Sequence, residues 1–365
     1  MSNINQRITA VDILRGITIL FMIIVNNPGS GNSVFQPLLH AEWNGITPTD
    51  YIFPTFLFIV GVSIVLSLGK RIESNSKLDL IKHVFIRSVK IYFVGIFLWL
   101  WYDFNFNEIR WVGVLHRIAF VYFSCSLLYL YTSKKQQLYI GASILLLYLV
   151  VMCFVPIPGI GPPDLSVPEK NWAHYLDSIL LPGVMWEGNW DPEGLLSTFP
   201  AIVTGMIGMW VGYILKSKIS LEKRLVRLAI ISAGLLILGD LTQYIFPLNK
   251  HLWSSSFTLL LGGISITILT VCIYVCDILE MNNKINFARF IGMNAIFAYV
   301  LADLLRVFFY DDIFWGFTPN TVIVSSLGNI GISLKLASFL YALFYSFIIW
   351  VPTYYLYKRK IFIKL

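Results

Sequence analysis

The chain has 365 residues, of which 57% are hydrophobic and only 13% are charged, and its mean hydropathy is +0.73. This composition excludes an ordinary water-soluble globular protein and indicates a protein whose solvent is the lipid bilayer. The formal net charge of +7 suggests a nucleic-acid partner at first sight, but the basic residues are distributed as membrane topology requires, so no nucleic-acid partner is expected.

Ten largely uncharged apolar stretches follow one another along the chain. They lie near residues 11–28, 51–69, 84–102, 111–132, 137–155, 193–215, 226–247, 252–276, 286–309 and 330–356. A helix needs about 20 apolar residues to cross a hydrocarbon core of roughly 30 Å. We therefore predict an all-α fold, a polytopic helical bundle of about ten transmembrane helices in one domain over residues 1–365. The first stretch is short, which also allows a tilted or re-entrant piece.

Lys and Arg residues are unevenly divided between the loops on the two sides of these spans. If the N-terminus is cytoplasmic, all but six of the 27 basic residues fall on the cytoplasmic side, counting span ends with the nearer face. The six exceptions are Arg110, Arg117, Lys170, Lys250, Arg306 and Lys335. Because short loops rich in Lys and Arg stay in the cytoplasm, we predict that both chain termini are cytoplasmic.

Two connections on the opposite side are long, residues 29–50 and residues 156–192. They contain the tryptophans Trp43, Trp172, Trp186 and Trp190. Long loops in compact domains are usually functional or disordered, and tryptophans favour order at a membrane interface. We expect both loops to be ordered lids that cover a site.

Two polar residues of the first outer loop and the span before it suit acyl transfer. An imidazole, with an unperturbed pKa of about 6.5, can take a proton from an amine near neutral pH or attack a thioester itself. His40 is such a candidate, although a lone loop histidine is more often solvated and inert. The amide of Asn26, at the end of the first span, could stabilise the oxyanion of a tetrahedral intermediate. The alternative for Asn26 and Asn27 is a helix cap before a turn.

Ionisable residues collect at the outer ends of the predicted spans, where their cost in a bilayer makes their placement informative. The set is His40, Glu42, Asp50, Arg117, Asp191, Glu193, Asp303 and Arg306. Asp303 and Arg306 are three residues apart, so a structural ion pair is as good an interpretation as a site role. Asp12 and Arg15 share this spacing on the cytoplasmic side, where local pairing is expected and contact of Arg15 with a phosphate is the alternative. Beside Arg117, His116 is a further candidate.

The sequence gives little support for a metal site or for redox chemistry. The four cysteines are Cys125, Cys153, Cys272 and Cys276, and all lie in apolar spans. They are expected to be packing residues, and no histidine or cysteine spacing is typical of a metal site. We therefore expect no metal cofactor.

Several separated motifs resemble those of one enzyme family. They occupy residues 7–16, 25–26, 40–50, 53–58, 191–197, 249–254, 292–294 and 357–362. In this pattern the sequence is similar to heparan-α-glucosaminide N-acetyltransferase and its bacterial relatives over nearly the whole chain. A match spread over separated motifs is more specific than any one of them.

The resemblance implies a transmembrane acetyl-CoA-dependent acyltransferase. Such an enzyme moves an acetyl group from cytoplasmic acetyl-CoA to the amine of a glucosamine-type sugar on the periplasmic or lumenal side. The chain begins almost directly at the first span, without the N-terminal lumenal domain of the lysosomal members. We therefore expect a small bacterial-type acceptor, glucosamine or a cell-wall amino sugar, and a bacterial inner membrane.

The resemblance also implies roles for individual residues. His40 matches the catalytic histidine of the family, and Asn26 matches its partner asparagine. Arg15 and Asn294 are assigned to acetyl-CoA binding from side and polarity. The residues assigned to the acceptor sugar on the same grounds are Glu42, Asp50, Arg117, Asp191, Glu193 and Asp303.

Some questions stay open at this point. His40 acts either as a general base in a ternary complex or as a nucleophile that becomes acetylated. An O-acetyltransferase of a surface glycan and a secondary transporter are the alternative functions; a transporter usually shows broken helices in matching positions of two halves, and no matching pair is evident. Acetyl-CoA, an amino sugar and membrane lipid are the expected partners, and a homodimer is compatible with the sequence.

Overall fold

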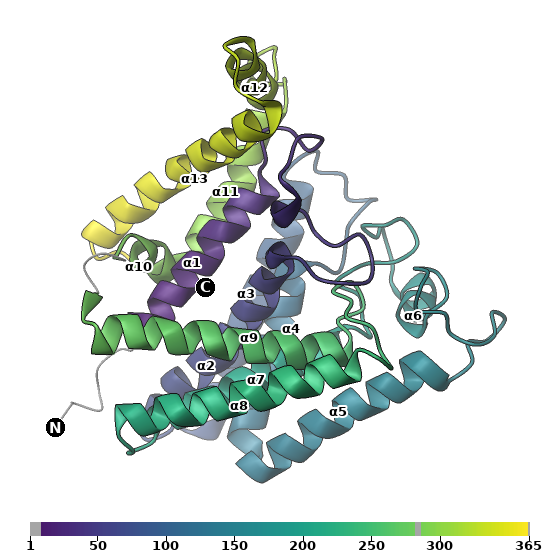
Figure 1. Ribbon diagram of the computed structural model, residues 1–365, viewed down its shortest axis with the longest axis vertical. Helices are drawn as coiled ribbons and strands as arrows, with labels where there is room; N and C mark the ends of the chain where they lie inside the picture. Colours follow the sequence, from purple (N-terminus) through teal and green to yellow (C-terminus); the bar gives the residue numbers. More distant parts are fainter. Residues whose placement is uncertain (1–8, 282–285, 364–365) are drawn as a thin grey trace. The chain divides into compact units, whose positions relative to one another are not determined.

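The structure is a computed structural model that describes residues 9–281 and 286–363, and this part of the chain is helical with loops, turns and two isolated β-bridges. Its α-helices, labelled in Figure 1, are α1 (Thr9–Asn26), α2 (Ile52–Arg71), α3 (Lys77–Leu100), α4 (Val114–Tyr131), α5 (Lys134–Phe154), α6 (Trp172–Leu180), α7 (Thr198–Lys216), α8 (Leu221–Thr242), α9 (Ser255–Ile273), α10 (Asn286–Met293), α11 (Ala295–Tyr310), α12 (Pro319–Asn329) and α13 (Leu334–Lys358). Two 3-10 helices, η1 (Gln36–Leu38) and η2 (Pro48–Tyr51), and a π-helical turn, η3 (Tyr274–Ile278), complete the order. The all-α prediction is confirmed.

Nine helices of the described chain are long and apolar enough to cross a membrane, and α10 with α11 makes a tenth span if this pair, bent by 81°, is counted as one. A bilayer core offers no hydrogen-bond partners to the backbone, so each apolar stretch satisfies its own N–H and C=O groups as a helix. The prediction of a polytopic membrane protein with about ten spans is confirmed. The sharp break lies in the ninth predicted stretch, whereas the first stretch is one continuous helix of 18 residues.

Span boundaries differ from the predicted ones where polar side chains bond to the backbone. The sixth stretch was predicted from residue 193, but α7 begins at Thr198 and residues 193–197 precede it as a turn. Two helices, α6 and α12, lie outside the predicted stretches. In α6 the buried N-cap Asn171 accepts a hydrogen bond from the His174 backbone N–H at 3.0 Å, which fixes where this loop helix begins.

The chain separates into two compact units, which are described one at a time. Unit 1 contains residues 41–46 and 54–270, and unit 2 contains the described residues of the ranges 5–40, 47–53 and 271–365. Unit 1 therefore holds α3 to α8 with most of α2 and α9, and unit 2 holds α1 and α10 to α13. That the whole chain is one domain stays a prediction.

Glycines let helices of unit 1 approach each other at backbone distance. A Cβ atom on Gly61 of α2 would lie 1.8 Å from the Gly205 carbonyl oxygen of α7. A Cβ on Gly208 of α7 would lie 2.0 Å from the Phe58 carbonyl oxygen of α2. Small residues of this kind are typical of tight helix pairs in membranes, where close backbone packing is the main attraction between helices.

The same device joins α1 to α10 in unit 2. A Cβ on Gly16 would lie 1.7 Å from the Ala288 carbonyl oxygen, and a Cβ on Gly292 would lie 1.8 Å from the Asp12 carbonyl oxygen. Arg15 donates through Nη1 to Asp12 Oδ1 at 3.1 Å and to the Gly292 carbonyl oxygen at 3.2 Å. The predicted pairing of Asp12 with Arg15 is confirmed, and the motifs at 7–16 and 292–294 meet at this crossing.

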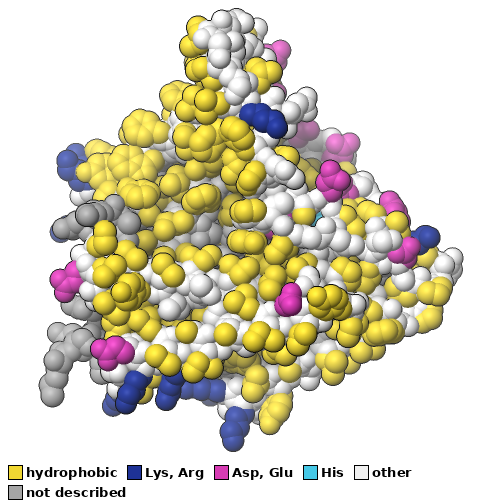
Figure 2. All heavy atoms as spheres, in the orientation of Figure 1, with side chains coloured by type: hydrophobic (Ala, Val, Ile, Leu, Met, Phe, Trp, Pro, Cys, Tyr) yellow, Lys and Arg dark blue, Asp and Glu magenta, His cyan; other side chains and the backbone are white. Residues whose placement is uncertain are grey.

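Basic residues gather at one end of unit 1. The Lys216 ammonium at the end of α7 donates to the Gly69 carbonyl oxygen near the end of α2 at 2.8 Å, and the Lys134 ammonium at the start of α5 lies 4.5 Å from the Tyr213 ring centroid of α7. Figure 2 shows Lys and Arg side chains along the edge where α8 begins. Several helix ends with their short connections therefore share one basic end, which is the arrangement that the positive-inside rule requires. The cytoplasmic position of this end and of the termini stays a prediction.

Candidate functional site

His40 is paired with a buried carboxylate. Its Nδ1 lies 2.6 Å from Asp50 Oδ1, and 44% of the His40 side chain is exposed against 1% of the Asp50 side chain. A carboxylate only accepts hydrogen bonds, so Nδ1 carries a proton, and the neutral form of the ring would have its lone pair on Nε2. The geometry is that of a histidine oriented by an aspartate.

The 3-10 helix η2 holds Asp50 in place. Its N-cap is Thr47, and Asp50 Oδ2 accepts hydrogen bonds from the Thr47 backbone N–H at 2.9 Å and from the Thr47 hydroxyl at 3.1 Å. The Thr47 hydroxyl also donates to the Leu39 carbonyl oxygen at 2.6 Å, directly before His40. In the structure the Asp50 carboxylate is engaged by the capping box and by His40, and its predicted contact with the acceptor sugar stays a prediction.

Asn26 is the last residue of α1 and is exposed, while its neighbour Asn27 is buried. Asn27 Nδ2 donates to the Ile23 carbonyl oxygen at 2.8 Å, which confirms the expected capping role of Asn27. The chain beyond it is fixed by hydrogen bonds from Tyr310 to the Pro28 carbonyl oxygen at 3.0 Å and from the Gly29 N–H to the Ser338 carbonyl oxygen at 3.2 Å. Asn26 is thus presented from an anchored helix end, and its catalytic role stays a prediction.

Asn294, assigned to acetyl-CoA from sequence, occupies the bend between α10 and α11. The side chain is buried, its Nδ2 donates to the Ile361 carbonyl oxygen at 3.2 Å and its Oδ1 accepts from the Ile363 N–H at 3.0 Å. The motif residue therefore ties the C-terminal segment to the bend. Contacts of Asn294 and Arg15 with acetyl-CoA stay predictions.

An ion-pair network lies at the end of unit 1 opposite its basic end. Arg110 donates through Nε and Nη2 to the two oxygens of Asp191, both at 2.7 Å, and through Nη2 to Glu193 at 2.7 Å. Burial opposes the charge on Arg110, but the two carboxylates outweigh it and raise the pKa of the guanidinium. Asp191 also accepts backbone N–H bonds from Trp186 and Glu193. Asp191 is therefore engaged in holding this turn, and the 12% exposed Glu193 is the more accessible member of the pair.

Arg117 is fully buried in α4 of unit 1. Its Nη2 donates to Ser197 Oγ, and its guanidinium lies 5.0 Å from the Trp253 ring centroid. The donors Nε and Nη1 have no hydrogen-bond partner among the described residues. A buried guanidinium with spare donors is costly, so this position suits a group that meets a ligand or water.

The rings of His174, Trp190 and His251 pack around Trp43 in one cluster. The Trp43 ring is stacked with His251 at 5.5 Å and meets Trp190 edge-on at 5.6 Å, and His174 stacks on Trp190 at 4.0 Å. Burial, with a smaller contribution from His251, lowers the pKa of His174 to about 3, so this imidazole is neutral at physiological pH. Trp43 Nε1 also donates to the Leu165 carbonyl oxygen at 2.9 Å. The expected order of the two outer loops is confirmed for these residues, and their role as lids stays a prediction.

Asn249 connects two of the motifs within unit 1. The buried side chain donates through Nδ2 to Asn44 Oδ1 at 3.1 Å and accepts the Leu252 N–H at 2.8 Å. Asp177 of α6 similarly accepts the Leu195 N–H at 2.9 Å, next to Gly194, where an added Cβ would lie 1.9 Å from Asp177 Oδ2. Burial raises the pKa of Asp177 to about 6. The motifs at 40–50, 191–197 and 249–254 are thus fixed by buried polar side chains.

Sequence reasoning missed Arg110, Asp177, His174, His251 and Asn249. Arg110 had a signal, because it is a basic residue on the acidic side, and Asn249 and His251 lie in the motif at 249–254. His174 and Asp177 lie in the loop helix α6, outside the predicted spans, and only their tertiary contacts show their importance. The sugar-binding roles of all the predicted residues stay predictions. Of those not yet described, Glu42 is exposed and Asp303 lies on α11. The Arg306 guanidinium lies 5.6 Å from the Tyr310 ring centroid, and no ion pair joins it to Asp303 in the described chain.

Comparison with known proteins adds a family match. Residues 7–248 match the protein-family model described as heparan-alpha-glucosaminide N-acetyltransferase, catalytic. The heparan-alpha-glucosaminide N-acetyltransferase of Mus musculus is 27% identical over 360 residues, covering 83% of this chain and 54% of the relative. That of Homo sapiens is 29% identical over 366 residues, covering 85% and 54%. The chain spans about half the length of these curated relatives.

Proposed function

The chain belongs to the heparan-α-glucosaminide N-acetyltransferase catalytic family, and from this premise we propose that it is an integral membrane enzyme that transfers an acetyl group from acetyl-CoA to the amine of a glucosamine-type sugar. The observation that carries the proposal is the His40–Asp50 pair, with 2.6 Å between Nδ1 and Oδ1. Acyl transfer to an amine needs a base, and an imidazole fixed in one tautomer by a carboxylate is a base suited to neutral pH.

In a direct transfer, the amine nitrogen of the sugar attacks the thioester carbonyl carbon while His40 Nε2 takes the proton that the nitrogen loses. The tetrahedral intermediate then breaks its carbon–sulfur bond, and the proton passes from His40 to the departing thiolate. Asp50 stabilises the imidazolium that forms between these steps. The exposed amide of Asn26, at an anchored helix end, supplies an N–H donor for the oxyanion.

In the alternative sequence, His40 Nε2 itself attacks the thioester carbonyl. The thiolate leaves, and the acetyl group resides on the imidazole until the sugar amine attacks it. Both sequences use the same residues. Isolation of the protein after reaction with labelled acetyl-CoA in the absence of sugar separates them, because only the second leaves a label on His40.

The two ligands differ in charge, and unit 1 offers a different end to each. Its basic end attracts a polyanionic cofactor, and we place this end in the cytoplasm with the nucleotide part of acetyl-CoA. The opposite end carries the partly exposed Glu193, whose carboxylate suits an acceptor with an ammonium group and several hydroxyls. An enzyme of the bacterial inner membrane acting on a periplasmic amino sugar fits this arrangement.

Proteoliposomes test the activity. Radiolabelled acetyl-CoA is supplied on one side and glucosamine on the other, and the sugar is analysed by mass spectrometry. The expected product is N-acetylglucosamine, with none formed by His40→Ala protein. Uptake of unmodified sugar would instead support the transporter alternative, and acetylation of N-acetylglucosamine would support an O-acetyltransferase. Normal turnover by a folded His40→Ala variant would contradict the assignment of His40.

A further inference from the structure

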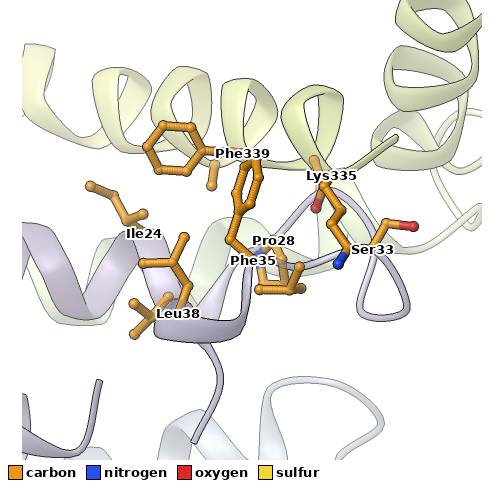
Figure 3. Close-up of a pocket in the computed structure, with 11 residues that line it drawn as sticks. Ile24, Pro28, Ser33, Phe35, Leu38, Lys335 and Phe339 are labelled. Atoms are coloured by element: carbon orange, nitrogen blue, oxygen red, sulfur yellow. The ribbon is translucent and has the colours of Figure 1, made fainter. Parts of the chain in front are cut away.

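A small open groove, called the pocket below, lies in unit 2 between the end of α1, the segment that follows it and the start of α13 (Figure 3). The side chains of Ile24, Leu38, Phe35 and Phe339 form its apolar part, and Lys335 and Ser33 lie together at its other side. The Phe35 and Phe339 rings meet edge-on with centroids 6.2 Å apart. The pocket is therefore amphipathic, with an apolar wall and one cationic side.

Lys335 is one of the six basic residues predicted on the non-cytoplasmic side, and no ion pair within the described chain accounts for its position there. Other exceptions are accounted for, because Arg110 pairs with Asp191 and Arg306 covers the Tyr310 ring. Lys335 is exposed, and its ammonium forms none of the salt bridges found among residues 9–281 and 286–363. In Figure 3 its side chain extends from α13 toward Ser33.

The position of Lys335 along its helix places this ammonium at a membrane surface. Lys335 is the second residue of α13, a candidate span of 25 residues, so it lies at one end of the crossing. The neighbouring face of α13 exposes Leu336, Leu340, Leu343 and Phe347 at helical spacing. Such a stripe on a spanning helix faces lipid. Lys335 and Phe339, which line the pocket, each precede a residue of this stripe and lie directly beside it on α13.

We propose that this pocket binds an anionic phospholipid. The phosphodiester lies against the Lys335 ammonium and the Ser33 hydroxyl, and the first methylenes of one acyl chain lie against Ile24, Phe35 and Phe339. A lysine near a membrane surface gains about 1 kcal/mol from anionic lipid, and the apolar wall removes lipid methylenes from the polar interface. Charge, depth and the adjoining lipid-facing stripe select this ligand over a soluble anion, which would leave the apolar wall uncovered.

Native mass spectrometry of the purified full chain in detergent tests the site. The protein is titrated with phosphatidylglycerol or with phosphatidylcholine of the same acyl chains, and bound lipid is counted. Retention of phosphatidylglycerol is expected to be about fivefold stronger, and Lys335→Gln is expected to remove this preference. Lys170→Gln, an equal charge change in an exposed loop, is the matched control and is expected to keep the preference.

A second variant separates the two parts of the pocket. Phe339→Ala shortens the apolar wall and is expected to weaken retention of both lipids, whereas Lys335→Gln affects only the acidic one. Equal retention of the two lipids by the unaltered protein, or an unchanged preference in Lys335→Gln, would overturn the proposal. Displacement of phosphatidylglycerol by millimolar inorganic phosphate would also overturn it, because the pocket would then be a site for free anions.

Discussion

At the scale of single residues, polar side chains that the sequence scatters along the chain act in pairs. Asp50 orients His40, Arg110 balances Asp191 and Glu193, and Asn249 holds Asn44. Each pairing uses a buried polar group whose partner offsets the cost of its burial. Removing one partner is therefore more harmful than the small number of atoms suggests.

Asp50→Asn tests the orientation of the catalytic histidine. Asparagine keeps an oxygen for the Thr47 N–H, so its Nδ2 faces His40 and the ring must accept there, which moves the proton to Nε2. The expected result is a fall in kcat on the order of 10²- to 10⁴-fold with the folded state intact. Steady-state kinetics and thermal unfolding measure the two effects. Asp164→Asn, in an exposed loop segment, is the control, and unchanged kcat in Asp50→Asn would refute the pairing as a catalytic feature.

Arg110→Ala tests the ion-pair network. The change leaves the carboxylate of Asp191 buried without its cation, which is expected to lower the free energy of unfolding by about 3 kcal/mol. The free energy of unfolding of Arg110→Lys is expected to lie between those of the unaltered protein and Arg110→Ala. An ammonium keeps the positive charge but cannot reproduce the bidentate bonds to Asp191. Thermal unfolding in detergent gives the order of the three proteins. Equal stability of all three would mean that the network is not important for folding.

At the scale of helices and loops, close contacts decide how the motifs are arranged. The crossing of α1 and α10 brings the motif at 7–16 to the motif at 292–294 through two glycines. The ring cluster around Trp43 and the α6 helix fix the long outer loop within unit 1. Motif residues such as these glycines and tryptophans therefore have a structural role: they hold the helices and the loop in place.

Gly16→Ala tests the helix crossing. The new methyl group would lie 1.7 Å from the Ala288 carbonyl oxygen, so the helices must separate, at an expected cost of about 1–3 kcal/mol. Gly234→Ala in α8 is the matched control, because its added Cβ meets nothing within 4 Å and alanine favours a helix by about 0.5–1 kcal/mol. Thermal unfolding is expected to show a lower Tm for the first variant and an equal or higher Tm for the second. The reverse order would contradict the crossing.

The ring cluster predicts a pH dependence of the outer loop. His174 has a pKa lowered to about 3 by burial, so the folded state binds fewer protons than the unfolded state between this value and the ordinary pKa of 6.5. Its stabilisation is fully present above pH 6.5 and decreases as the pH falls toward 3, by on the order of 1 kcal/mol per pH unit within this window. Tryptophan fluorescence during unfolding at pH 7 and pH 5 measures the change.

Asp177 has the opposite effect to His174 on stability as the pH falls, so it serves as the control. Burial raises its pKa from 3.8 to about 6, so its protonation favours the folded state as the pH falls through 6. His174→Phe is therefore expected to remove the loss of stability in acid, and Asp177→Asn is expected to make that loss steeper. An identical pH profile in the His174→Phe variant would show that another group governs the transition.

At the scale of the whole molecule, the proposed function requires one particular orientation of the chain in the membrane. The basic end of unit 1 contains short connections rich in Lys and Arg, and the loops at 29–50 and 156–192 are predicted to lie on the other side of the membrane. Labelling with a membrane-impermeant maleimide tests this orientation with one exposed cysteine in each region, Glu42→Cys and Lys223→Cys. In intact cells, Glu42→Cys is expected to react and Lys223→Cys to react only after lysis. Reaction of Lys223→Cys in intact cells would reverse the orientation.

The sequence by itself determined the class of fold, the approximate spans and the principal candidates, because helices in a bilayer must be long, apolar and self-bonded, and because His40 and Asn26 stand in recognisable motifs. It also predicted the Asp12–Arg15 pair, which depends only on helical spacing. Tertiary structure decided the 81° break at Asn294, the clamp of Asn294 on the C-terminal segment and the partner of His40. The tertiary structure also decided that Asp191 pairs with Arg110 and that His174 stacks on Trp190. The physical reason is that these properties arise from contacts between residues distant in sequence or held by irregular backbone, where no periodic pattern reports which groups meet.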